Sequence, residues 1–299
     1  MKRTPFALGL SLVLLVGSAH AGVGIVRGVE TMPKAERTQL TSKVATARRE
    51  QPAIFAKVDG VRESVAKLDA SKRGRHAIIS PALVALGKEA GLPLIEKLAL
   101  GTDAHPDLGA NAFVAWQLGV IEALGKLREE RAASALSAIF KGPETDADLV
   151  RATATALARI GTQESLEPLF AAPAEKRLVA FSALGDARKE ASAKFLVAEL
   201  DRAGDTESKR TLVEALGRLG SSWAWSTPAL VATGEADRVR HAIAEALVRT
   251  AAKSPDLKSD LEMALAMVEH PDTRKLISAE KSRADVNGQR SLDAIKIAF

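Results

Sequence analysis

Glu122-Ala-Leu-Gly-Lys-Leu127 is the first of five related stretches along the chain. Apolar residues upstream of each stretch recur at helical spacing, so we expect each stretch to end a helix. The starts of successive stretches are separated by 33, 27, 32 and 31 residues, a spacing typical of helical repeat proteins. The later stretches are Thr155-Ala-Leu-Ala-Arg-Ile160, Ser182-Ala-Leu-Gly-Asp-Ala187, Glu214-Ala-Leu-Gly-Arg-Leu219 and Glu245-Ala-Leu-Val-Arg-Thr250.

A second helical segment follows each of these stretches. Turn formers such as Gly142-Pro143 and His270-Pro271 separate the segments, so each unit is expected to contain two helices. A single helix pair cannot bury both of its apolar faces, and stacking of neighbouring pairs supplies the missing contacts. The sequence therefore predicts an all-α fold, an α-solenoid of about five to six helix pairs. Second helices are expected near residues 134–140, 164–170, 189–200 and 257–268.

Glycines close to these stretches predict where the helices stop. Glycine readily adopts the left-handed conformation at the C-terminus of a helix, because it has no side chain to clash there. We therefore expect helix ends in that conformation at Gly125, Gly161, Gly185 and Gly220.

Four of the five units carry an acidic residue and an arginine upstream of the Ala-Leu core. Two roles fit the arginines: they could line an anion-binding groove, or each could bond an acid or a loop carbonyl of the next unit in a structural ladder. We favour the ladder, because pairing each arginine with a nearby acid leaves little free positive charge. The residues are Asp148-x-x-Arg151, Glu175-x-Arg177, Glu207-x-x-Arg210 and Asp237-x-x-Arg240.

The acid-x-x-Arg start, the Ala-Leu-Gly end and the period near 31 residues resemble HEAT repeats. The resemblance is to the short type also seen in phycobilisome-lyase-like proteins, and it covers about two thirds of the chain. It implies a curved platform for a protein partner and supports the ladder. It predicts nothing about enzymatic activity, because one fold can host many functions.

The two flanks of the chain do not match the repeat. Two amphipathic helices, Lys34–Arg49 and Gln51–Leu68, are predicted in the N-terminal flank. In the C-terminal flank, Asn287-Gly288 predicts a turn. The expected domains are a secretory signal peptide at 1–21, an N-terminal helical cap or arm at 22–79, the HEAT-like array at 80–272 and a C-terminal cap at 273–299.

The chain begins like a secretory signal peptide. A basic start is followed by the apolar run Phe6–Val16 and by Ala19-His20-Ala21, a small-x-small cleavage site. This run is too short to span a bilayer comfortably, so we expect cleavage after Ala21 rather than anchoring. No later stretch approaches the length of a membrane span, so the mature chain is predicted to have no integral membrane segment. The expected destination is a bacterial periplasm, with the extracellular medium as the alternative.

Composition narrows the function classes further. The 299-residue chain has 46% hydrophobic and 26% charged residues, as globular proteins do, and a formal net charge of +5. Loss of residues 1–21 removes Lys2 and Arg3, which leaves a nearly neutral chain with both signs of charge mixed along it. A nucleic-acid binder needs a concentrated basic face, so nucleic acid is not an expected partner. The absence of cysteine excludes disulfides, thiolate metal sites and cysteine nucleophiles.

The motifs of the common enzyme classes are missing from the sequence. It has no serine-hydrolase, phosphate-loop or dinucleotide-binding motif, and Ser64-x-x-Lys67 alone is a weak signal. The His-Glu pairs that bind iron in the deoxyhypusine hydroxylase type of this repeat superfamily are also missing. We therefore expect no catalytic residue, no cofactor and no metal, unless distant residues converge on one. Histidines outside the signal, none at i,i+3 or i,i+4 spacing, are His76, His105, His241 and His270, with His105 and His270 in expected loops.

Trp223 and Trp225 are the best candidates for binding a partner. They lie in the polar stretch Ser221–Pro228, where the second helix of a unit should begin. Exposed tryptophans are typical anchors of protein interfaces. The alternative is that one indole packs in the core and the other covers it. Trp116 lies in an apolar helix and is expected in the core.

These observations predict an exported, non-enzymatic scaffold that binds a protein or peptide partner on a curved helical-repeat surface. We expect its inner face to consist of the arginine-bearing helices. One alternative is a lyase-like or chaperone-like protein that holds a small ligand in the groove, which would need a pocket with convergent polar groups. Another is a passive spacer in a larger envelope assembly, which would tolerate replacement of both Trp223 and Trp225.

Overall fold

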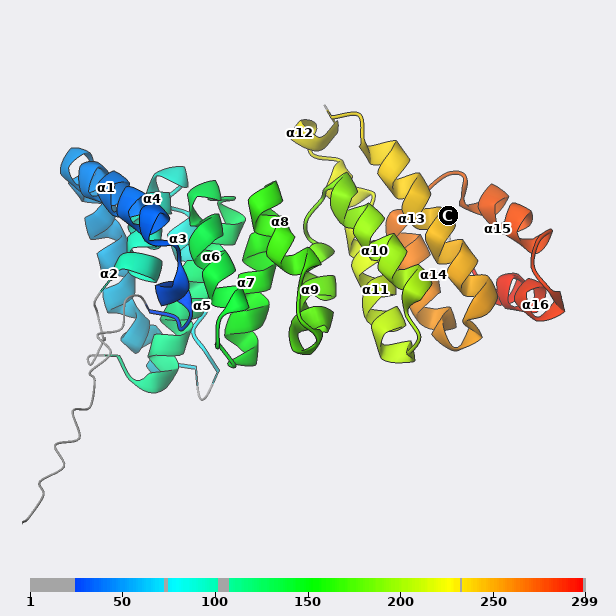
Figure 1. The fold of residues 1–299 in the computed structure, drawn as a ribbon, viewed down its shortest axis with the longest axis horizontal. Coiled ribbons are helices and arrows are strands. Elements are labelled where there is room, and N and C mark those ends of the chain that lie inside the picture. The colour runs from blue at the N-terminus through cyan, green and yellow to red at the C-terminus, as the bar shows by residue number, and fades with distance from the viewer. Residues whose placement is uncertain (1–24, 73–74, 102–107, 232, 298–299) are drawn as a thin grey trace, which may run out of the picture.

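The computed structural model describes residues 25–72, 75–101, 108–231 and 233–297. These residues form helices joined by loops, and no strand occurs among them, which confirms the all-α prediction for this part of the chain. The predicted signal at 1–21 and His105 lie outside it. Figure 1 shows the helices arranged along one long axis, from α1 near one end to α16 at the other.

The helices between residues 110 and 219 lie in two rows (Figure 1). In the first row each helix packs lengthwise on the next, and the second row covers one side of the first. The first row contains α5 (Ala110–Lys126), α7 (Ala147–Ile160), α9 (Arg177–Leu184) and α11 (Thr206–Leu219). The second row contains α6 (Ala133–Lys141), α8 (Gln163–Phe170) and α10 (Glu190–Arg202), with the 3₁₀ turns η4 (Glu130–Ala132) and η5 (Ala174–Lys176) in the links.

Two long helices and several short turns precede these rows. The helices α1 (Lys34–Glu50) and α2 (Pro52–Ala70) match the two predicted in the N-terminal flank to within two residues at each end. Proline at the first position of α2 suits a helix start, because its missing N–H would have no partner there. The short elements are η1 (Val29–Thr31), α3 (Ser80–Val84), η2 (Lys88–Ala90), α4 (Gly91–Ile95) and the π-helical turn η3 (Glu96–Leu100).

The N-terminal helices pack on the rows and do not stand apart. The turn η1 contacts α6, and α2 contacts α5. The Gln117 side-chain amide donates to the Ile25 carbonyl, and the Ser134 hydroxyl donates to the Glu36 carboxylate. Phe55 is buried in the same apolar cluster as the first-row leucines. Of the two predicted roles, cap and arm, these contacts fit a cap.

After α11, the order in which successive helices join the two rows is reversed. The turn η6 (Trp223–Trp225) and α12 (Pro228–Val231) follow α11, and both are too short to complete the second row. As a result, α13 (Ala236–Lys253) packs on α10 and continues the second row. The next helix, α14 (Lys258–Val268), packs on α11 and continues the first row, after the turn η7 (Pro255–Leu257).

Backbone conformation marks the same exchange. In α5, α7 and α9 of the first row, the residue four positions after the core leucine adopts the left-handed conformation, whereas Gly220 of α11 is right-handed. Glu269 does so four residues after Leu265 of α14, whereas Ala251 continues α13 four residues after Leu247. The interpretation of the stretch Glu245–Thr250 as a fifth helix end equivalent to the others is therefore wrong, because that stretch lies inside a second-row helix. The left-handed residues are Arg128, Gly161, Arg188 and Glu269, with φ of 51°, 71°, 47° and 47°.

The glycines act more through close helix contact than through helix ends. A β-carbon at Gly125 would lie 2.6 Å from the Cα atom of Ala156, so the bare glycine lets α5 and α7 approach. Gly185 and Gly220 end their helices in the right-handed conformation. The left-handed expectation therefore holds at Gly161 and is wrong at Gly125, Gly185 and Gly220.

The last two helices close the array on α13. They are α15 (Thr273–Lys281) and α16 (Val286–Ala294), and both pack on α13. Asn287-Gly288 lies inside α16 and forms no turn, because the Asp285 carboxylate caps that helix by accepting the Gly288 N–H at 2.7 Å. Within the described ranges, no helix is both long enough and apolar enough to cross a membrane.

Candidate functional site

The two candidate tryptophans occupy opposite environments. Trp225 is only 2% exposed, and its indole N–H donates to the Leu219 carbonyl at 2.6 Å. Trp223 is 77% exposed. The two residues are two positions apart in a 3₁₀ turn, which directs their side chains to different sides. Trp225 is thus a core residue and no part of an exposed pair, and Trp223 alone is available to a partner.

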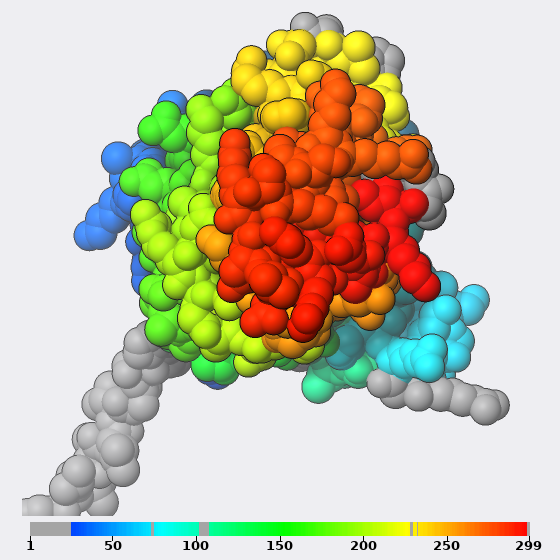
Figure 2. Space-filling model, turned by 90° about the vertical axis from the view of Figure 1, so that its right-hand side faces the viewer, coloured from blue at the N-terminus to red at the C-terminus, as the bar shows by residue number. Residues whose placement is uncertain are grey.

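We name the segment Ser221–Glu235, which carries Trp223, the Trp insert. Its start is tied to the end of α14: the Ser222 N–H donates to the Met267 carbonyl at 3.0 Å, and the Ser222 hydroxyl donates to Glu269 at 2.9 Å. The insert also exposes the side chain of Val231. Figure 2 shows this yellow segment protruding at the upper edge beyond the red C-terminal helices. The insert is therefore a protruding element with a fixed base.

The arginines of the proposed ladder make contacts of three kinds. Arg151 pairs with Asp148 of its own helix at 2.7 Å, and both side chains are exposed. Arg210 reaches Asp260 of α14 at 3.2 Å. Arg240 donates to the carbonyls at the end of α14, those of Val268 and Glu269, each at 2.7 Å. Arg210 and Arg240 thus link neighbouring helices, whereas the contact of Arg151 is local.

The remaining ladder residues form no chain of ion pairs. Arg177 and Glu207 have no ion-pair partner in the part of the chain that the structure describes. Asp237 contacts His270, with 3.3 Å between its Oδ1 and the ring Nε2. The residues therefore do not act as one repeating set, because their partners differ from unit to unit.

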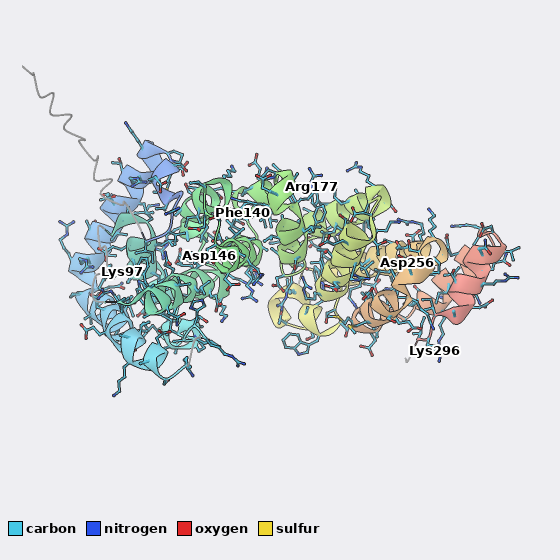
Figure 3. All side chains as sticks on the ribbon, turned by 90° about the horizontal axis from the view of Figure 1, so that it is seen from below. Lys97, Phe140, Asp146, Arg177, Asp256 and Lys296 are labelled. Carbon is cyan, nitrogen blue, oxygen red and sulfur yellow. The ribbon has the colours of Figure 1, made fainter. Side chains whose placement is uncertain are left out.

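Basic side chains missed by the sequence analysis bridge other joints. Lys176 donates to the Phe140 and Gly142 carbonyls at 2.6 and 2.8 Å. Figure 3 labels Phe140 and also Arg177, the residue that follows Lys176 in the sequence. Arg218 donates to the Ser182 carbonyl at 2.6 Å. These cations neutralise carbonyls at helix ends, where the helix dipole is negative. Both residues lie near a helix end and outside the acid-x-x-Arg pairs. A basic residue near a helix end was therefore the sequence signal that could have found them.

A polar hollow lies between α5 and α7 on the first row. Its volume is about 400 Å³, and its lining carries both acidic and basic side chains, among them Glu122, Lys126, Asp148, Arg151 and Arg159. Near its edge, burial lowers the pKa of the Arg128 guanidinium, and the neighbouring charges of Arg188 and Arg159 lower it further. Because side chains of both charges line the hollow, it offers no strongly anionic or cationic ligand a matched surface.

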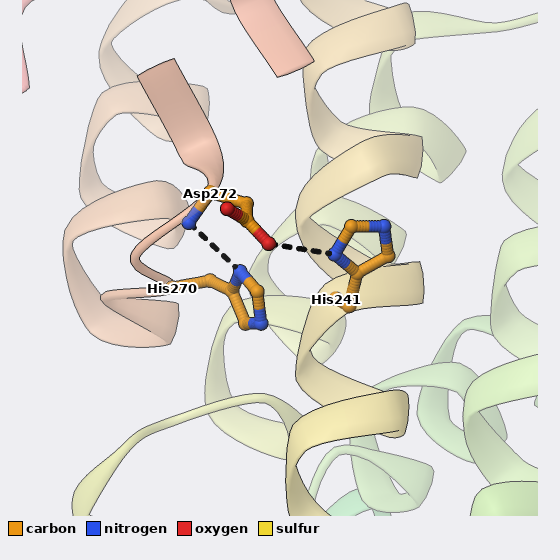
Figure 4. A group of neighbouring side chains, drawn as sticks. All are labelled: His241, His270 and Asp272. Carbon is orange, nitrogen blue, oxygen red and sulfur yellow. Dashed lines mark hydrogen bonds and ion pairs between the residues drawn. The ribbon is translucent and has the colours of Figure 1, made fainter. Parts of the chain in front are cut away.

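Two histidines that are far apart in the sequence converge at the C-terminal part. His241 lies on α13, and His270 lies in the link between α14 and α15, followed closely by Asp272 (Figure 4). The two imidazole rings meet edge to face with 5.1 Å between their centres. His241 Nδ1 is 3.8 Å from Asp272 Oδ2. One ligand atom from each residue lies within 4.8 Å of the other two.

Hydrogen bonds set the tautomer of the buried ring. The Asp272 N–H donates to His270 Nδ1 at 3.2 Å, so Nδ1 carries a lone pair. Nε2 carries the proton and donates to Asp237. His270 was predicted to lie in a loop, which the structure confirms, but its ring is almost fully buried. No spacing rule could find this cluster, because 29 residues separate the two histidines.

The Asp272 carboxylate is held in its charged form. A hydrogen bond from Lys275, 2.9 Å long, and the charge of Lys275 are the main causes that lower the pKa of Asp272 below its usual range. Lys275 contacts Oδ1, whereas Oδ2 faces His241. One carboxylate oxygen therefore stays available on the side of the two rings.

The described residues thus offer two candidate sites, the exposed indole of the Trp insert and the histidine cluster of His241, His270 and Asp272. No protein-family model matches the chain, and a comparison with curated proteins finds no match. We therefore infer its function from its own side chains.

Proposed function

We propose that this chain is an exported α-solenoid of HEAT-like helix pairs that binds a protein or peptide partner, with the Trp223 indole as its anchor. The packing of α5 on α7, α7 on α9 and α9 on α11 supports the solenoid, since units of such folds contact chiefly their neighbours. The recurring Ala-Leu core at the contact between these helices supports it further.

The exposure of Trp223 carries the proposal. An indole that is 77% exposed leaves a large apolar area in water, and burying it against a partner recovers that free energy. Tryptophan is among the residues that most often dominate protein interfaces. The Trp insert gives this indole no pocket of its own on the described surface.

The base of the Trp insert makes the anchor rigid. The buried Trp225 hydrogen bond and the contacts of Ser222 hold the turn on both sides of Trp223. Little backbone entropy is then lost when a partner covers the indole, which favours binding. The partner should present an apolar pocket with a hydrogen-bond acceptor for the indole N–H, and polar groups around it that face Ser226 and Thr227.

Crosslinking with two matched variants tests this proposal. The mature protein, Trp223→Ala and Ile78→Ala are compared in the cells that express them, and captured proteins are identified by mass spectrometry. Ile78 is the control, because it is another apolar side chain, 79% exposed, on a different part of the surface. We expect a protein that wild type and Ile78→Ala capture and Trp223→Ala does not.

A binding measurement with that purified protein then gives the strength of the anchor. Loss of a hot-spot tryptophan weakens binding by roughly thirtyfold or more, about 2 kcal/mol. Equal capture by all three forms, or equal affinity of wild type and Trp223→Ala, would refute Trp223 as the anchor. Trp225→Ala is unsuitable here, since removal of a buried indole would destabilise the fold itself.

Export is a separate part of the proposal. The N-terminal pattern supports cleavage after Ala21, so the mature protein should begin at Gly22. Intact-mass measurement of the protein from its native cells tests this directly. A mass that includes residues 1–21 would contradict it.

A further inference from the structure

We propose that His241, His270 and Asp272 bind one divalent transition-metal ion of the zinc class, and that this ion ties α13 to the link between α14 and α15. The site is independent of the Trp223 anchor. Its three donors come from two elements that the row exchange brings together.

The donor set suits zinc. Imidazole nitrogens and one carboxylate oxygen are ligands that Zn²⁺ accepts in a tetrahedral site, with bonds of about 2.0–2.1 Å. Such bonds place neighbouring ligand atoms roughly 3.3 Å apart, and the three atoms here already lie within 4.8 Å of one another. His241 and Asp272 are half-buried, so their side chains can close the difference by small rotations.

The buried ring is already oriented as a ligand. Asp237 accepts a hydrogen bond from the Nε2–H of His270, which leaves the Nδ1 lone pair on the side of Asp272. A carboxylate on the far nitrogen of a metal-binding histidine is a common arrangement, and it fixes the tautomer and raises the basicity of the ligand. The metal would replace a single 3.2 Å hydrogen bond from the Asp272 N–H.

The charges around the cluster favour a cation. The Asp272 and Asp237 carboxylates both attract a cation, and Lys275, which pairs with Asp272, offsets one of these two charges. Lys275 holds Oδ1 of Asp272 from the exposed side and leaves Oδ2 facing His241. Calcium and magnesium are poor candidates, because both prefer sites made of oxygen ligands. Two imidazoles select zinc, cobalt, nickel or copper instead.

The fourth ligand position would face solvent. His241 and Asp272 are both partly exposed, so a water molecule can complete the tetrahedron. The three side chains join α13 to the link between α14 and α15, so the ion would stabilise the C-terminal part of the array by an amount that rises with the logarithm of its concentration above the dissociation constant. This makes binding visible as a rise in melting temperature, besides direct detection.

Titration of the full-length mature protein with Zn²⁺ and with Co²⁺ tests the site. The protein is purified without a histidine tag and treated with a chelator first. We expect one equivalent of Zn²⁺ by calorimetry, a higher melting temperature with Zn²⁺, and visible Co²⁺ absorption of the tetrahedral kind. Mg²⁺ should produce none of these effects.

Three variants and one control locate the ion. His241→Ala and Asp272→Asn each remove a partly exposed ligand, so they should fold and should weaken Zn²⁺ binding at least tenfold. Asp237→Asn should weaken it by about 10- to 100-fold through the orientation of His270. His76→Ala removes a histidine outside the cluster and should leave binding unchanged. Affinity equal to wild type in both ligand variants, or no binding of either ion at millimolar concentration, would overturn the proposal.

Discussion

The units before the Trp insert and the units after it share one kind of contact and differ in another. Between α5 and α11, the joints depend on small residues that let helix backbones touch, as at Gly125 against Ala156 and Gly185 against Ala215. Beyond α11, polar contacts at the end of α14 add to the joint, including those of Arg240 and Ser222. The close apolar contact continues beyond the insert, at Gly217 against Ala264, and basic side chains reach carbonyls in both regions. The region after the insert differs in that two histidines meet there.

The difference shows what the repeated stretch does. The glycine or alanine of the stretch marks the contact between neighbouring first-row helices. This holds only while each unit contributes one helix to each row. At the Trp insert the second helix is reduced to short turns, with the buried Trp225 beside the end of α11. From that point the Ala-Leu pair of α14, Ala264-Leu265, takes the first-row place. The similar pair in α13, Ala246-Leu247, lies in the second row.

The largest effect is expected from the leucines that both regions bury. Leu157→Ala and Leu265→Ala should each lower the free energy of unfolding by roughly 2–5 kcal/mol, because each leaves a cavity in the core. Urea denaturation measures the change. Leu68→Ala is the control, since Leu68 is largely exposed and should cost little. A small effect at both positions would contradict their burial in the core, and a large effect at only one of them would break the equivalence of α7 and α14.

The next prediction tests the row exchange directly. The chain has no cysteine, so an engineered pair can form only the intended disulfide. Gly217→Cys/Ala264→Cys should crosslink on oxidation, since the two β-carbons would lie 3.0 Å apart and a separation of the helices by about 0.8 Å brings them to the disulfide mean of about 3.8 Å. The bond should stabilise the oxidised protein by roughly 2–4 kcal/mol over its reduced form.

Gly217→Cys/Ala246→Cys is the matched pair for the other arrangement. If α13 instead of α14 followed α11 in the first row, this second pair would crosslink and the first would not. Intact mass under non-reducing conditions distinguishes the two outcomes.

A smaller effect should follow from filling the α5–α7 contact. Gly125→Ala places a β-carbon 2.6 Å from the Cα atom of Ala156, so the helices must separate, at a cost of roughly 1–3 kcal/mol. Gly60→Ala in α2 is the control, because open space surrounds that position. It should stabilise the protein by about 0.5–1 kcal/mol through helix propensity. Thermal unfolding of both variants measures the contrast, and equal shifts would disprove the close contact.

The smallest effect concerns a surface ion pair across the exchange. Glu190 of α10 contacts Arg238 of α13 at 2.7 Å, and hydrogen bonds from Arg238 and then Lys194 lower its pKa from 4.5 to about 2. Because the folded-state pKa is the lower one, the contribution is complete above pH 4.5 and is lost as the pH falls toward 2.

Glu190→Gln should therefore lose less stability than wild type between pH 5 and about pH 2. The difference should be small, since the pair is exposed to solvent. Melting temperatures across this pH range measure it. Parallel curves for wild type and Glu190→Gln would show that α10 and α13 do not depend on this pair.

The sequence by itself determined the local features of this protein. Helical periodicity predicted α1 and α2 nearly to their ends, the all-α class, and burial of the core leucines such as Leu124 and Leu157. These features depend on residues within a few turns of one another, where the spacing of apolar side chains and the rules of helix starts are sufficient.

Only the tertiary structure decided which helices meet. It placed Trp225 in the core and left Trp223 exposed, put α13 in the second row, and brought His241 beside His270. The sequence of a repeated helix shows which of its faces is apolar. It does not show which other helix packs on that face, because this depends on how many helices precede it in the chain. Because the Trp insert has only short turns in place of a second-row helix, the next long helix, α13, joins the second row and α14 joins the first. This arrangement brings His241 beside His270.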